Sequence, residues 1–286
     1  MATCRPRFVP LPVLVALCVA APAFGAGKPS VAALQVALRE RGFYAGTVDG
    51  AAGPATTAAL KRFQRRAGLP ADGVVGPRTR RALGRYGRHL LGTRQLRSGE
   101  SGWDVAALQF LLAWHGFPSA TIDGRFGGHV ERALRGFERW AALPVDGIGG
   151  GAVLAALRRP PPRCPLSLAW PVRGAVGSVF GPRGNRFHTG VDLVAPAGTP
   201  VVAARAGRVV YADWYTGYGR LVVVAHGDGV RSFYAHLSRF TVRLGAWVGT
   251  GERVGLVGAS GEATGPHLHF EVRVRGAAVD PLPALR

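Results

Sequence analysis

Histidines whose spacing suits metal binding gather near the end of the chain, where five of the eight histidines follow residue 165. The densest segment reads Pro-His-Leu-His-Phe-Glu-Val over residues 266–272. Side chains alternate between the two faces of a strand, so His267 and His269 would share one face, with Cα atoms about 6.5 Å apart. One imidazole could then bind a metal ion while the other reaches a water on that ion. Two packed or surface histidines are the alternative interpretation.

A second segment, His-Thr-Gly-Val-Asp over residues 188–192, adds another histidine and a carboxylate. In an extended strand His188 and Asp192 would be about 13 Å apart, too far to share an ion. Gly190 lies between them and allows the chain to bend and bring them together. Two histidines and one carboxylate, with water in the fourth position, form a typical catalytic zinc site. Alone, the His-x-x-x-Asp pattern is weak evidence.

The elements that position these residues are predicted to be strands. Runs rich in Val, Phe and Tyr, broken by glycines, cover residues 201–210, 221–224, 232–237 and 268–274. Asp228-Gly229, between two of the runs, is a typical hairpin turn. The pattern predicts an antiparallel β domain over residues 166–286.

This domain resembles the lysostaphin-like (LytM-type) zinc endopeptidases, which cut peptide bonds in peptidoglycan. The matching segments are residues 177–183, 188–193, 198–201, 234–237, 265–272 and 280–281. The resemblance implies that His188, Asp192 and His269 bind Zn²⁺. It also implies that His267 and His236 are two further active-site histidines. All five residue types are present, which argues against the family members that have lost ligands and only activate other hydrolases.

A histidine must then accept and donate the protons of the reaction, because the chain has no His-Glu-x-x-His motif to supply a glutamate base. Histidine titrates near neutrality and suits this work. His267 is the predicted general base because it lies beside His269. His236 then orients the water or stabilises the oxyanion, and the two roles could also be reversed.

An internal repeat precedes the β domain. Residues 31–83 align without a gap with residues 105–157, at an offset of 74, with 24 identities in 53 positions. Apolar residues at helical spacing, separated by Asp-Gly turns, predict three short helices in each copy. Thr56 and Thr79 could cap or begin the second and third helices of the first copy.

Each copy resembles the three-helix peptidoglycan-binding domain. The first carries nearly all of its pattern, including Gly-Pro-Ala-Thr at 53–56 and Phe-Gln at 63–64. The second has Gly-Gly-His-Val at 127–130 and Glu138 instead, so it could be only a spacer. We expect repeat domains at 27–87 and 91–157, a stiff Pro-rich linker at 158–165, and the zinc peptidase domain at 166–286. The fold class is thus two small all-α domains followed by an antiparallel all-β domain.

The first 25 residues resemble a secretory signal peptide: Arg5 and Arg7 precede an apolar stretch, and small residues follow it. A lipid anchor at Cys18 is a competing interpretation, weakened by the bulky Leu17 before it. Cleavage would leave Cys164 as the sole thiol. No later stretch approaches the ~20 apolar residues of a membrane span. We therefore expect a secreted protein of the cell wall or periplasm.

The chain is strongly basic, with 36 Lys and Arg against 16 Asp and Glu. Residues 27–164 hold 21 basic and 9 acidic residues, so the repeats carry most of the excess. Such charge favours an anionic partner, and an anionic wall polymer would fit it. Apolar residues make up 48% of the chain, which excludes wholesale disorder.

Three functions compete. The leading hypothesis is a zinc endopeptidase that its repeats direct to peptidoglycan. The second is a non-catalytic wall-binding regulator or activator that keeps a structural metal site. The third, an exported nucleic-acid binder, rests on charge alone and lacks an aromatic and basic signature, so no nucleic-acid partner is expected.

Overall fold

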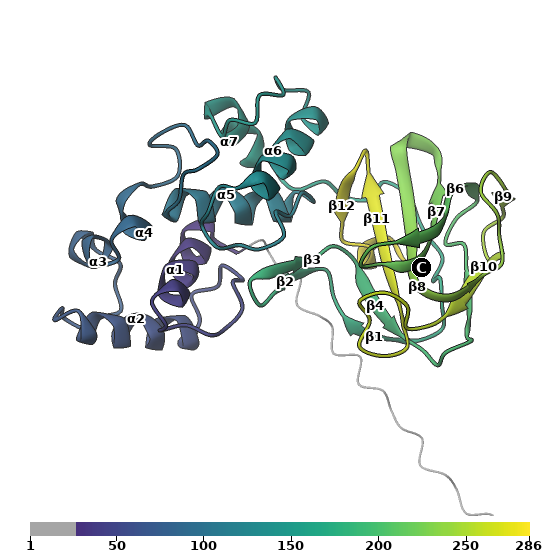
Figure 1. Ribbon diagram of the computed structural model, residues 1–286, viewed down its shortest axis with the longest axis horizontal. Helices are drawn as coiled ribbons and strands as arrows, with labels where there is room; N and C mark the ends of the chain where they lie inside the picture. The colour runs from purple at the N-terminus through teal and green to yellow at the C-terminus, as the bar shows by residue number, and fades with distance from the viewer. Residues whose placement is uncertain (1–26) are drawn as a thin grey trace, which may run out of the picture.

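The computed structural model describes residues 27–286, and the proposed signal peptide lies outside them. A helical region is followed by a β domain, which confirms the predicted fold class (Figure 1). The helices are α1 Pro29–Glu40, α2 Pro54–Arg66, α3 Pro77–Ala82, α4 Arg85–Arg88, α5 Trp103–Trp114, α6 Gly128–Trp140 and α7 Gly151–Leu157. None of the helices in the described part of the chain has the length and apolar character needed to cross a membrane.

The two repeats pack on each other instead of standing as separate domains. Helix α1 and its equivalent in the second copy, α5, lie side by side. One buried hydrophobic cluster contains residues of both copies. Leu38 and Val48 come from the first copy, and Trp103, Phe110 and Ile122 come from the second. The second copy also has a cluster of its own, around Leu134 and Phe137. The repeats therefore form a helical pair with a shared core.

Buried amides organise the Asp-Gly turns of the first repeat. The Gln35 amide donates to Asp49 Oδ1 at 2.7 Å and accepts from the Gly50 N–H at 2.9 Å. The Gln64 amide donates to Asp72 Oδ1 at 2.7 Å and accepts from the Gly73 N–H at 2.9 Å. Each amide is buried and can both donate and accept, so it ties a helix to the turn that follows it.

Thr56 and Thr79 lie inside α2 and α3 and do not cap them. The N-cap residues are Gly53 and Gly76, and neither helix has a side-chain cap. The threonine hydroxyls instead lie within hydrogen-bond distance of the Gln35 and Gln64 amides. The capping alternative was wrong because these hydroxyls belong to the turn networks, whereas both threonines lie in the first turn, near the expected start of each helix.

The β domain is built on one antiparallel sheet. Its strands are β1 Ala175–Ser178, β4 Val191–Val194, β5 Pro200–Val202, β6 Gly207–Tyr215, β7 Gly219–Ala225, β8 Val230–Phe240, β9 Trp247–Val248, β10 Arg253–Val257, β11 His267–Val274 and β12 Ala277–Val279. The main order is β1-β4-β11-β8-β7-β6-β9, with β12 beside β11, and β10 beside β8 and β5. The short helix η1 (Gly227–Gly229) turns β7 into β8, at the predicted Asp-Gly hairpin. A second short helix, η2 (Leu282–Ala284), follows β12.

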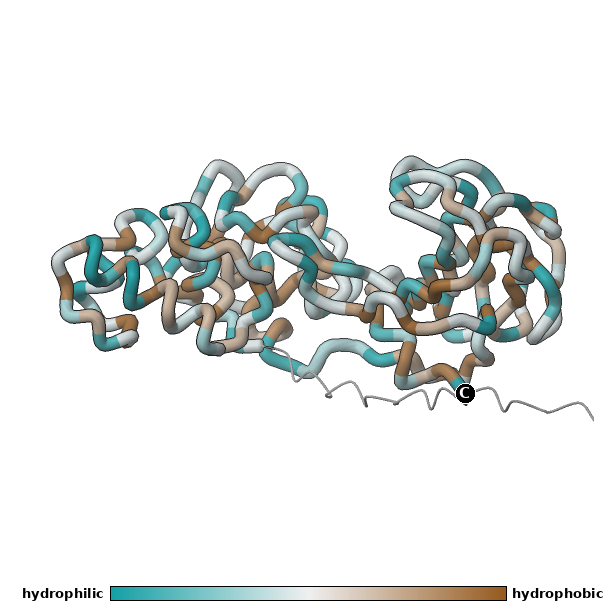
Figure 2. The backbone as a smooth tube through the Cα atoms, turned by 90° about the horizontal axis from the view of Figure 1, so that it is seen from below, coloured by the Kyte–Doolittle hydropathy of each residue, from teal (hydrophilic) through white to brown (hydrophobic). Residues whose placement is uncertain are grey.

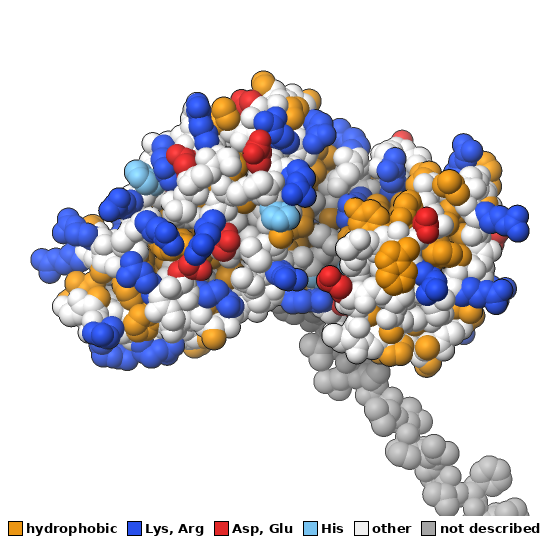
Figure 3. Space-filling view, viewed as in Figure 1, with side chains coloured by type: hydrophobic (Ala, Val, Ile, Leu, Met, Phe, Trp, Pro, Cys, Tyr) orange, Lys and Arg blue, Asp and Glu red, His pale blue; other side chains and the backbone are white. Residues whose placement is uncertain are grey.

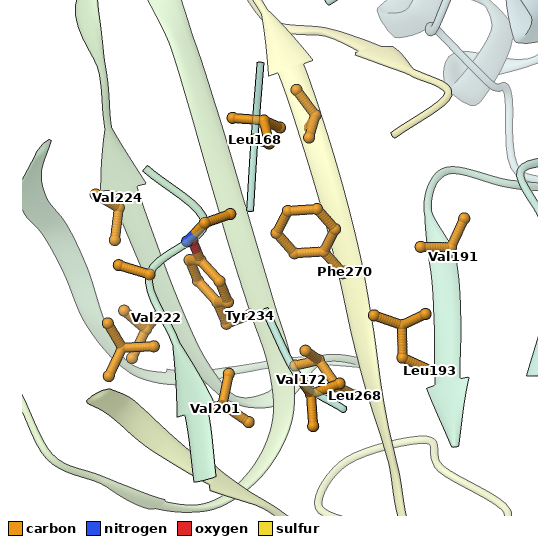
Figure 4. Close-up of a cluster of buried hydrophobic side chains, with 14 of the residues drawn as sticks. Leu168, Val172, Val191, Leu193, Val201, Val222, Val224, Tyr234, Leu268 and Phe270 are labelled. Atoms are coloured by element: carbon orange, nitrogen blue, oxygen red, sulfur yellow. The ribbon is translucent and has the colours of Figure 1, made fainter. Parts of the chain in front are cut away.

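One face of the sheet covers the core. Leu268, Phe270 and Val272 of β11 are fully buried, and Phe270 lies beside Tyr234 of β8 (Figure 4). The Tyr234 hydroxyl accepts a hydrogen bond from the Ala204 N–H at 2.8 Å, so this large polar ring is satisfied inside the core. Because strand faces alternate, the histidines and Glu271 of β11 lie on the opposite face.

A separate hairpin of the β domain lies between its main sheet and the helical pair (Figure 1). Strands β2 Gly181–Arg183 and β3 Arg186–His188 form a two-stranded sheet of their own. The chain enters this hairpin from edge strand β1 and leaves it into β4. The hairpin extends from the β domain toward the helical pair (Figure 1). Seen from below, the helical and β regions form two lobes (Figure 2).

Candidate metal centre

Three side chains predicted as metal ligands meet at one point. His188 Nε2 lies 3.0 Å from Asp192 Oδ1 and 3.0 Å from His269 Nδ1. Asp192 Oδ1 is 2.9 Å from His269 Nδ1. The three atoms therefore form a nearly equilateral triangle whose members all carry lone pairs. Such a triangle is stable only around positive charge, either protons or a metal ion.

The strands set this geometry. Asp192 on β4 pairs directly with His269 on β11, and two residues separate His188, at the end of β3, from the start of β4. The chain changes direction between these strands, as expected for Gly190. The reason for glycine there differs from the prediction, because a Cβ at this position would lie 2.3 Å from the Phe270 carbonyl oxygen. Gly190 permits the close approach of β11.

Each ligand is fixed from behind by a second contact. The Nδ1–H of His188 donates to the Val179 carbonyl at 2.8 Å, and the Nε2–H of His269 donates to Glu271 Oε1 at 3.0 Å. The Arg183 guanidinium donates to Asp192 Oδ2 at 2.7 Å, which leaves Oδ1 for the centre. Each donor atom therefore turns a free lone pair toward the same point.

Glu271 is a fully buried carboxylate behind this centre. Its oxygens accept hydrogen bonds from the Tyr218 hydroxyl at 2.7 Å and from Arg273 Nε at 2.8 Å, and Thr189 also donates to it. Burial alone would raise the pKa of Glu271, but Arg273 and His269 hold it well below its usual range. Glu271 is therefore ionised, and its charge strengthens His269 as a donor to a cation.

The same charges act on the ligands themselves. Burial would lower the pKa of His269, but Asp192 and Glu271 raise it to about 9. Burial would raise the pKa of Asp192, but hydrogen bonds from His188 and His269 lower it strongly. The centre thus attracts positive charge, and a divalent metal can take the place of protons there.

The remaining two predicted histidines, His267 and His236, lie beside this triangle. Their ring centroids are 4.8 Å apart, and His267 Nε2 is 3.7 Å from Asp192 Oδ1. The Nδ1–H of His267 donates to the Gly265 carbonyl at 2.9 Å, and the Nδ1–H of His236 donates to the Ser260 carbonyl at 2.7 Å. Both rings therefore keep Nε2 free to take a proton. Burial lowers the pKa of His236, which keeps it neutral near pH 7.

A β-bulge brings His236 to the site. Arg220 and Val222 of β7 pair with Leu237 and Tyr234 of β8, so two residues of β8 oppose one of β7. His236 is one of these two and has φ 60°, an unfavourable conformation for a residue with a Cβ. In a regular strand it would share the core-facing side with Tyr234. The bulge turns it to the opposite face, where the other histidines lie.

These side chains line one cleft of about 310 Å³. The cleft is lined by Arg183, His188, Thr189, Asp192, Gly217, Tyr218, His236, Glu262, Thr264, His267 and His269. It holds all five residues that the sequence selected. The network behind the ligands was not predicted, although Glu271 and Arg273 continue the alternation of His267 and His269 along β11.

The donor set fits zinc. Two imidazole nitrogens and one carboxylate oxygen are ligands that catalytic zinc uses, and bonds of ~2.0–2.1 Å to a tetrahedral ion place ligand atoms about 3.3 Å apart. The observed separations of 2.9–3.0 Å are close to this value. The cleft gives access for a water or substrate, as a catalytic site requires.

Other residues considered from the sequence have structural surroundings. His226 Nδ1 is 2.9 Å from the Ala206 carbonyl and its Nε2 is 2.8 Å from Ser232 Oγ, so both nitrogens are bonded within the fold. Cys164 is half-buried, packs against the β-domain core, and donates to the Leu166 carbonyl. Burial raises the pKa of the Cys164 thiol, which makes it a poor nucleophile.

Comparison with known proteins identifies both regions. Residues 186–281 match the model of Peptidase family M23. Residues 27–83 and 101–157 match the family described as "Putative peptidoglycan binding domain". Both resemblances found in the sequence are therefore confirmed.

Three curated relatives are similar to parts of this chain. The DD-carboxypeptidase/endopeptidase Mpg of Neisseria meningitidis is 46% identical over 97 residues, which are 34% of this chain and 22% of Mpg. The peptidoglycan DD-endopeptidase ShyA of Vibrio cholerae is 37% identical over 157 residues, 52% of this chain and 36% of ShyA. The murein hydrolase activator EnvC of Escherichia coli is 42% identical over 118 residues, 41% of this chain and 28% of EnvC.

The chain spans 22% to 36% of the length of these relatives, so the similarity covers a part and not the whole of each protein. Both enzymes and an activator occur among them. The family matches and the strand-built histidine site agree on one assignment: residues 186–281 form a Peptidase family M23 domain, and two domains of the peptidoglycan-binding type precede it.

Proposed function

We propose that this protein is a zinc-dependent endopeptidase that cleaves peptide bonds in peptidoglycan. His188, Asp192 and His269 bind the zinc ion, and His267 and His236 assist the reaction. The observation that carries the proposal is the orientation of four histidines, each with one nitrogen bonded to the protein and the other facing the shared cleft.

A zinc ion held by these three residues would lower the pKa of a water molecule and polarise the scissile carbonyl. The protein supplies the proton transfers. His267 accepts the proton of the attacking water at Nε2 and passes it to the leaving amine, because its Nδ1–H is fixed on the Gly265 carbonyl. The neutral His236 accepts a hydrogen bond from the water at Nε2 and orients it, and it could stabilise the oxyanion only after taking a proton there. An exchange of these two roles would use the same free nitrogens.

The helical pair brings the enzyme to the wall in this proposal. Two peptidoglycan-binding-type domains precede the catalytic domain, and Lys and Arg side chains are spread over the face of the helical region seen in Figure 3. Positive charge favours residence on an anionic polymer, with affinity that falls as the salt concentration rises. We propose that residues 1–25 act as a signal peptide that directs export, and that the protein then acts in the cell wall or periplasm.

A digestion experiment tests the proposal. Incubation of the purified protein with peptidoglycan should release new amine ends, and mass spectrometry of the fragments should identify the bond. Chelation or Asp192→Ala should abolish the release, whereas Asp213→Ala should retain it, since Asp213 is exposed on β6. Release that survives Asp192→Ala would contradict the zinc mechanism.

The similarity to EnvC favours one alternative, a non-catalytic activator of other wall hydrolases. That function predicts stoichiometric zinc with no amine release by the protein alone, and amine or glycan release only after a second hydrolase is added. The complete set of five residues in one cleft favours the enzyme.

A further inference from the structure

The hairpin β2–β3 is held by the helical pair as well as by its own strands. Trp114, at the end of α5, packs edge-on against Phe187 with ring centroids 5.3 Å apart, and against Phe180 at 6.3 Å. Phe180 and Phe187 pack on each other at 5.0 Å. Trp114 also packs on Phe110, which belongs to the shared helical core. A continuous aromatic cluster therefore joins this core to the hairpin.

Both repeats also bind the hairpin tip through equivalent backbone groups. The Val48 N–H donates to the Gly184 carbonyl at 2.7 Å, and the Ile122 N–H donates to the Asn185 carbonyl at 2.7 Å. Val48 and Ile122 occupy the same position in the two repeats, since they differ by the repeat offset of 74. The first repeat thus donates to one carbonyl of the tip, and the second repeat donates to the next carbonyl along the chain.

The hairpin carries two residues of the metal centre. His188 ends β3, and Arg183 ends β2 and bonds the Oδ2 atom of Asp192. These strands pair with each other and lie outside the ladder of the main sheet. The contacts of Trp114, Val48 and Ile122 therefore fix a segment that the large sheet does not fix.

We infer that the helical pair is a positioning element of the metal centre, acting through the β2–β3 hairpin. Trp114 is the positioning residue whose side chain packs on both Phe180 and Phe187, and it holds the hairpin so that His188 and Arg183 meet Asp192. The second repeat then has a role beyond that of a spacer, because it supplies both Trp114 and Ile122. This inference rests on the proposed zinc site but not on any peptidase activity.

Zinc affinity, measured by competition with a chromophoric chelator in the absence of peptidoglycan, tests the inference in the full-length mature protein. Trp114→Ala should weaken zinc binding on the order of tenfold or more, the size expected when support behind a ligand is lost. Trp114→Phe, which keeps an aromatic ring, should retain most of the zinc affinity of the starting protein. The visible spectrum of the cobalt-substituted Trp114→Ala protein should also change, because the His188 ligand is displaced.

Phe63→Ala is the matched control. Phe63 is buried in the first repeat and packs on Phe43, so its loss destabilises the helical region without removing a hairpin contact. Its melting temperature should fall at least as far as that of Trp114→Ala, while its zinc affinity at 25 °C stays unchanged. Trp114→Leu replaces Trp114→Ala if the latter is unfolded by circular dichroism.

The outcomes separate the inference from the proposed function. Unchanged zinc affinity and cobalt spectrum in a folded Trp114 variant would overturn the inference and leave the zinc enzyme intact. Equal weakening by Phe63→Ala would also overturn it, since general destabilisation would then explain the loss. A starting protein that binds no zinc would overturn both.

Discussion

Buried polar side chains are used in opposite ways in the helical pair and in the β domain. In the first repeat, Gln35 and Gln64 bond through both the oxygen and the nitrogen of the amide, all within the protein. In the metal centre each histidine bonds the supporting fold through one nitrogen and points the other into the cleft, where those of His188 and His269 meet Asp192. Satisfied groups stabilise turns, whereas half-satisfied groups are available for chemistry.

This difference indicates that the residues that stabilise the helical pair and the residues that carry the chemistry of the cleft can be changed independently. The free ring nitrogens face the cleft and are not among the buried polar atoms without a partner in the described residues, so water can hydrate them. The strained φ of His236 is a cost to stability that the rest of the fold must offset. Substitutions in the helical networks should therefore reduce stability and keep chemistry, whereas substitutions at the free nitrogens should reduce chemistry and leave stability nearly unchanged.

The largest effect is expected at the free nitrogens. His267→Ala and His236→Ala should each lower kcat about 100- to 10,000-fold, the usual contribution of a positioned acid or base. Zinc affinity and melting temperature should stay near those of the starting protein, because neither ring is a ligand in the proposed set. Zinc titration and steady-state assays on a peptide substrate check this. Loss of zinc from either variant would show that the ligand set is wrong.

Glu271→Gln should have the next largest effect, this time on the metal. The amide keeps the size of the side chain but removes the charge behind His269, so zinc affinity should fall about 10- to 100-fold. Tyr218→Phe removes a neutral donor to the same carboxylate and serves as the milder comparison. Chelator competition measures both. Equal zinc affinities for Glu271→Gln and the starting protein would show that the charge of Glu271 does not support metal binding.

Gln64→Glu should destabilise the first repeat at neutral pH by about 1–3 kcal/mol. An ionised glutamate would face the Asp72 carboxylate and the Val74 carbonyl, to which the amide now donates. The loss should shrink on acidification, since a protonated carboxyl can donate again. Thermal unfolding across pH 4–8 measures it, and zinc affinity should not change. A pH-independent loss would contradict the electrostatic explanation.

The smallest effect is expected from the reverse change in the second repeat, Glu138→Gln. Burial raises the pKa of Glu138, and the Asp146 carboxylate adds to the rise, while the Gly147 N–H opposes it. A raised folded pKa means that the folded protein binds protons more tightly than the unfolded chain. Stability is therefore highest below the unfolded pKa of ~4.3 and falls as pH rises through the folded value.

Glu138→Gln should remove that fall and raise stability at pH 7 by about 1 kcal/mol, because the amide can donate to the Asp146 carboxylate as Gln64 does to Asp72. Melting temperatures at pH 4 and pH 7 measure the change. A variant less stable than the starting protein at pH 7 would show that the two repeats do not share this turn network.

The sequence predicted the parts of the site that depend on local pattern. Alternation along β11 placed His267 and His269 on one face, and the His-x-x-x-Asp pattern drew attention to His188 and Asp192. The family resemblance assigned these two as ligands and added His236. The bulge that turns His236 toward the cleft could not be predicted, because it depends on a two-against-one pairing with β7. The role of Glu271 follows from the same alternation once His269 is known to bond it.

Contacts between distant segments were not predictable in the same way. The repeat offset shows that Val48 and Ile122 are equivalent, but nothing in the local sequence shows that both bind the hairpin tip. Similarly, apolar helix faces predicted cores within each repeat, whereas α1 and α5 also share a core with each other. Such pairing depends on which buried faces meet, and many partners satisfy one apolar pattern.

The hydrogen bonds from the Val48 and Ile122 amides to two adjacent carbonyls of the hairpin tip have a practical consequence for building chimeras. A peptide has no twofold symmetry, so the two copies meet different residues of the tip and cannot be exchanged for each other. Grafting another helical module onto this β domain would need to replace both copies together and rebuild a tryptophan contact for the phenylalanine pair. A single-module fusion would leave one carbonyl without its donor and the hairpin half supported.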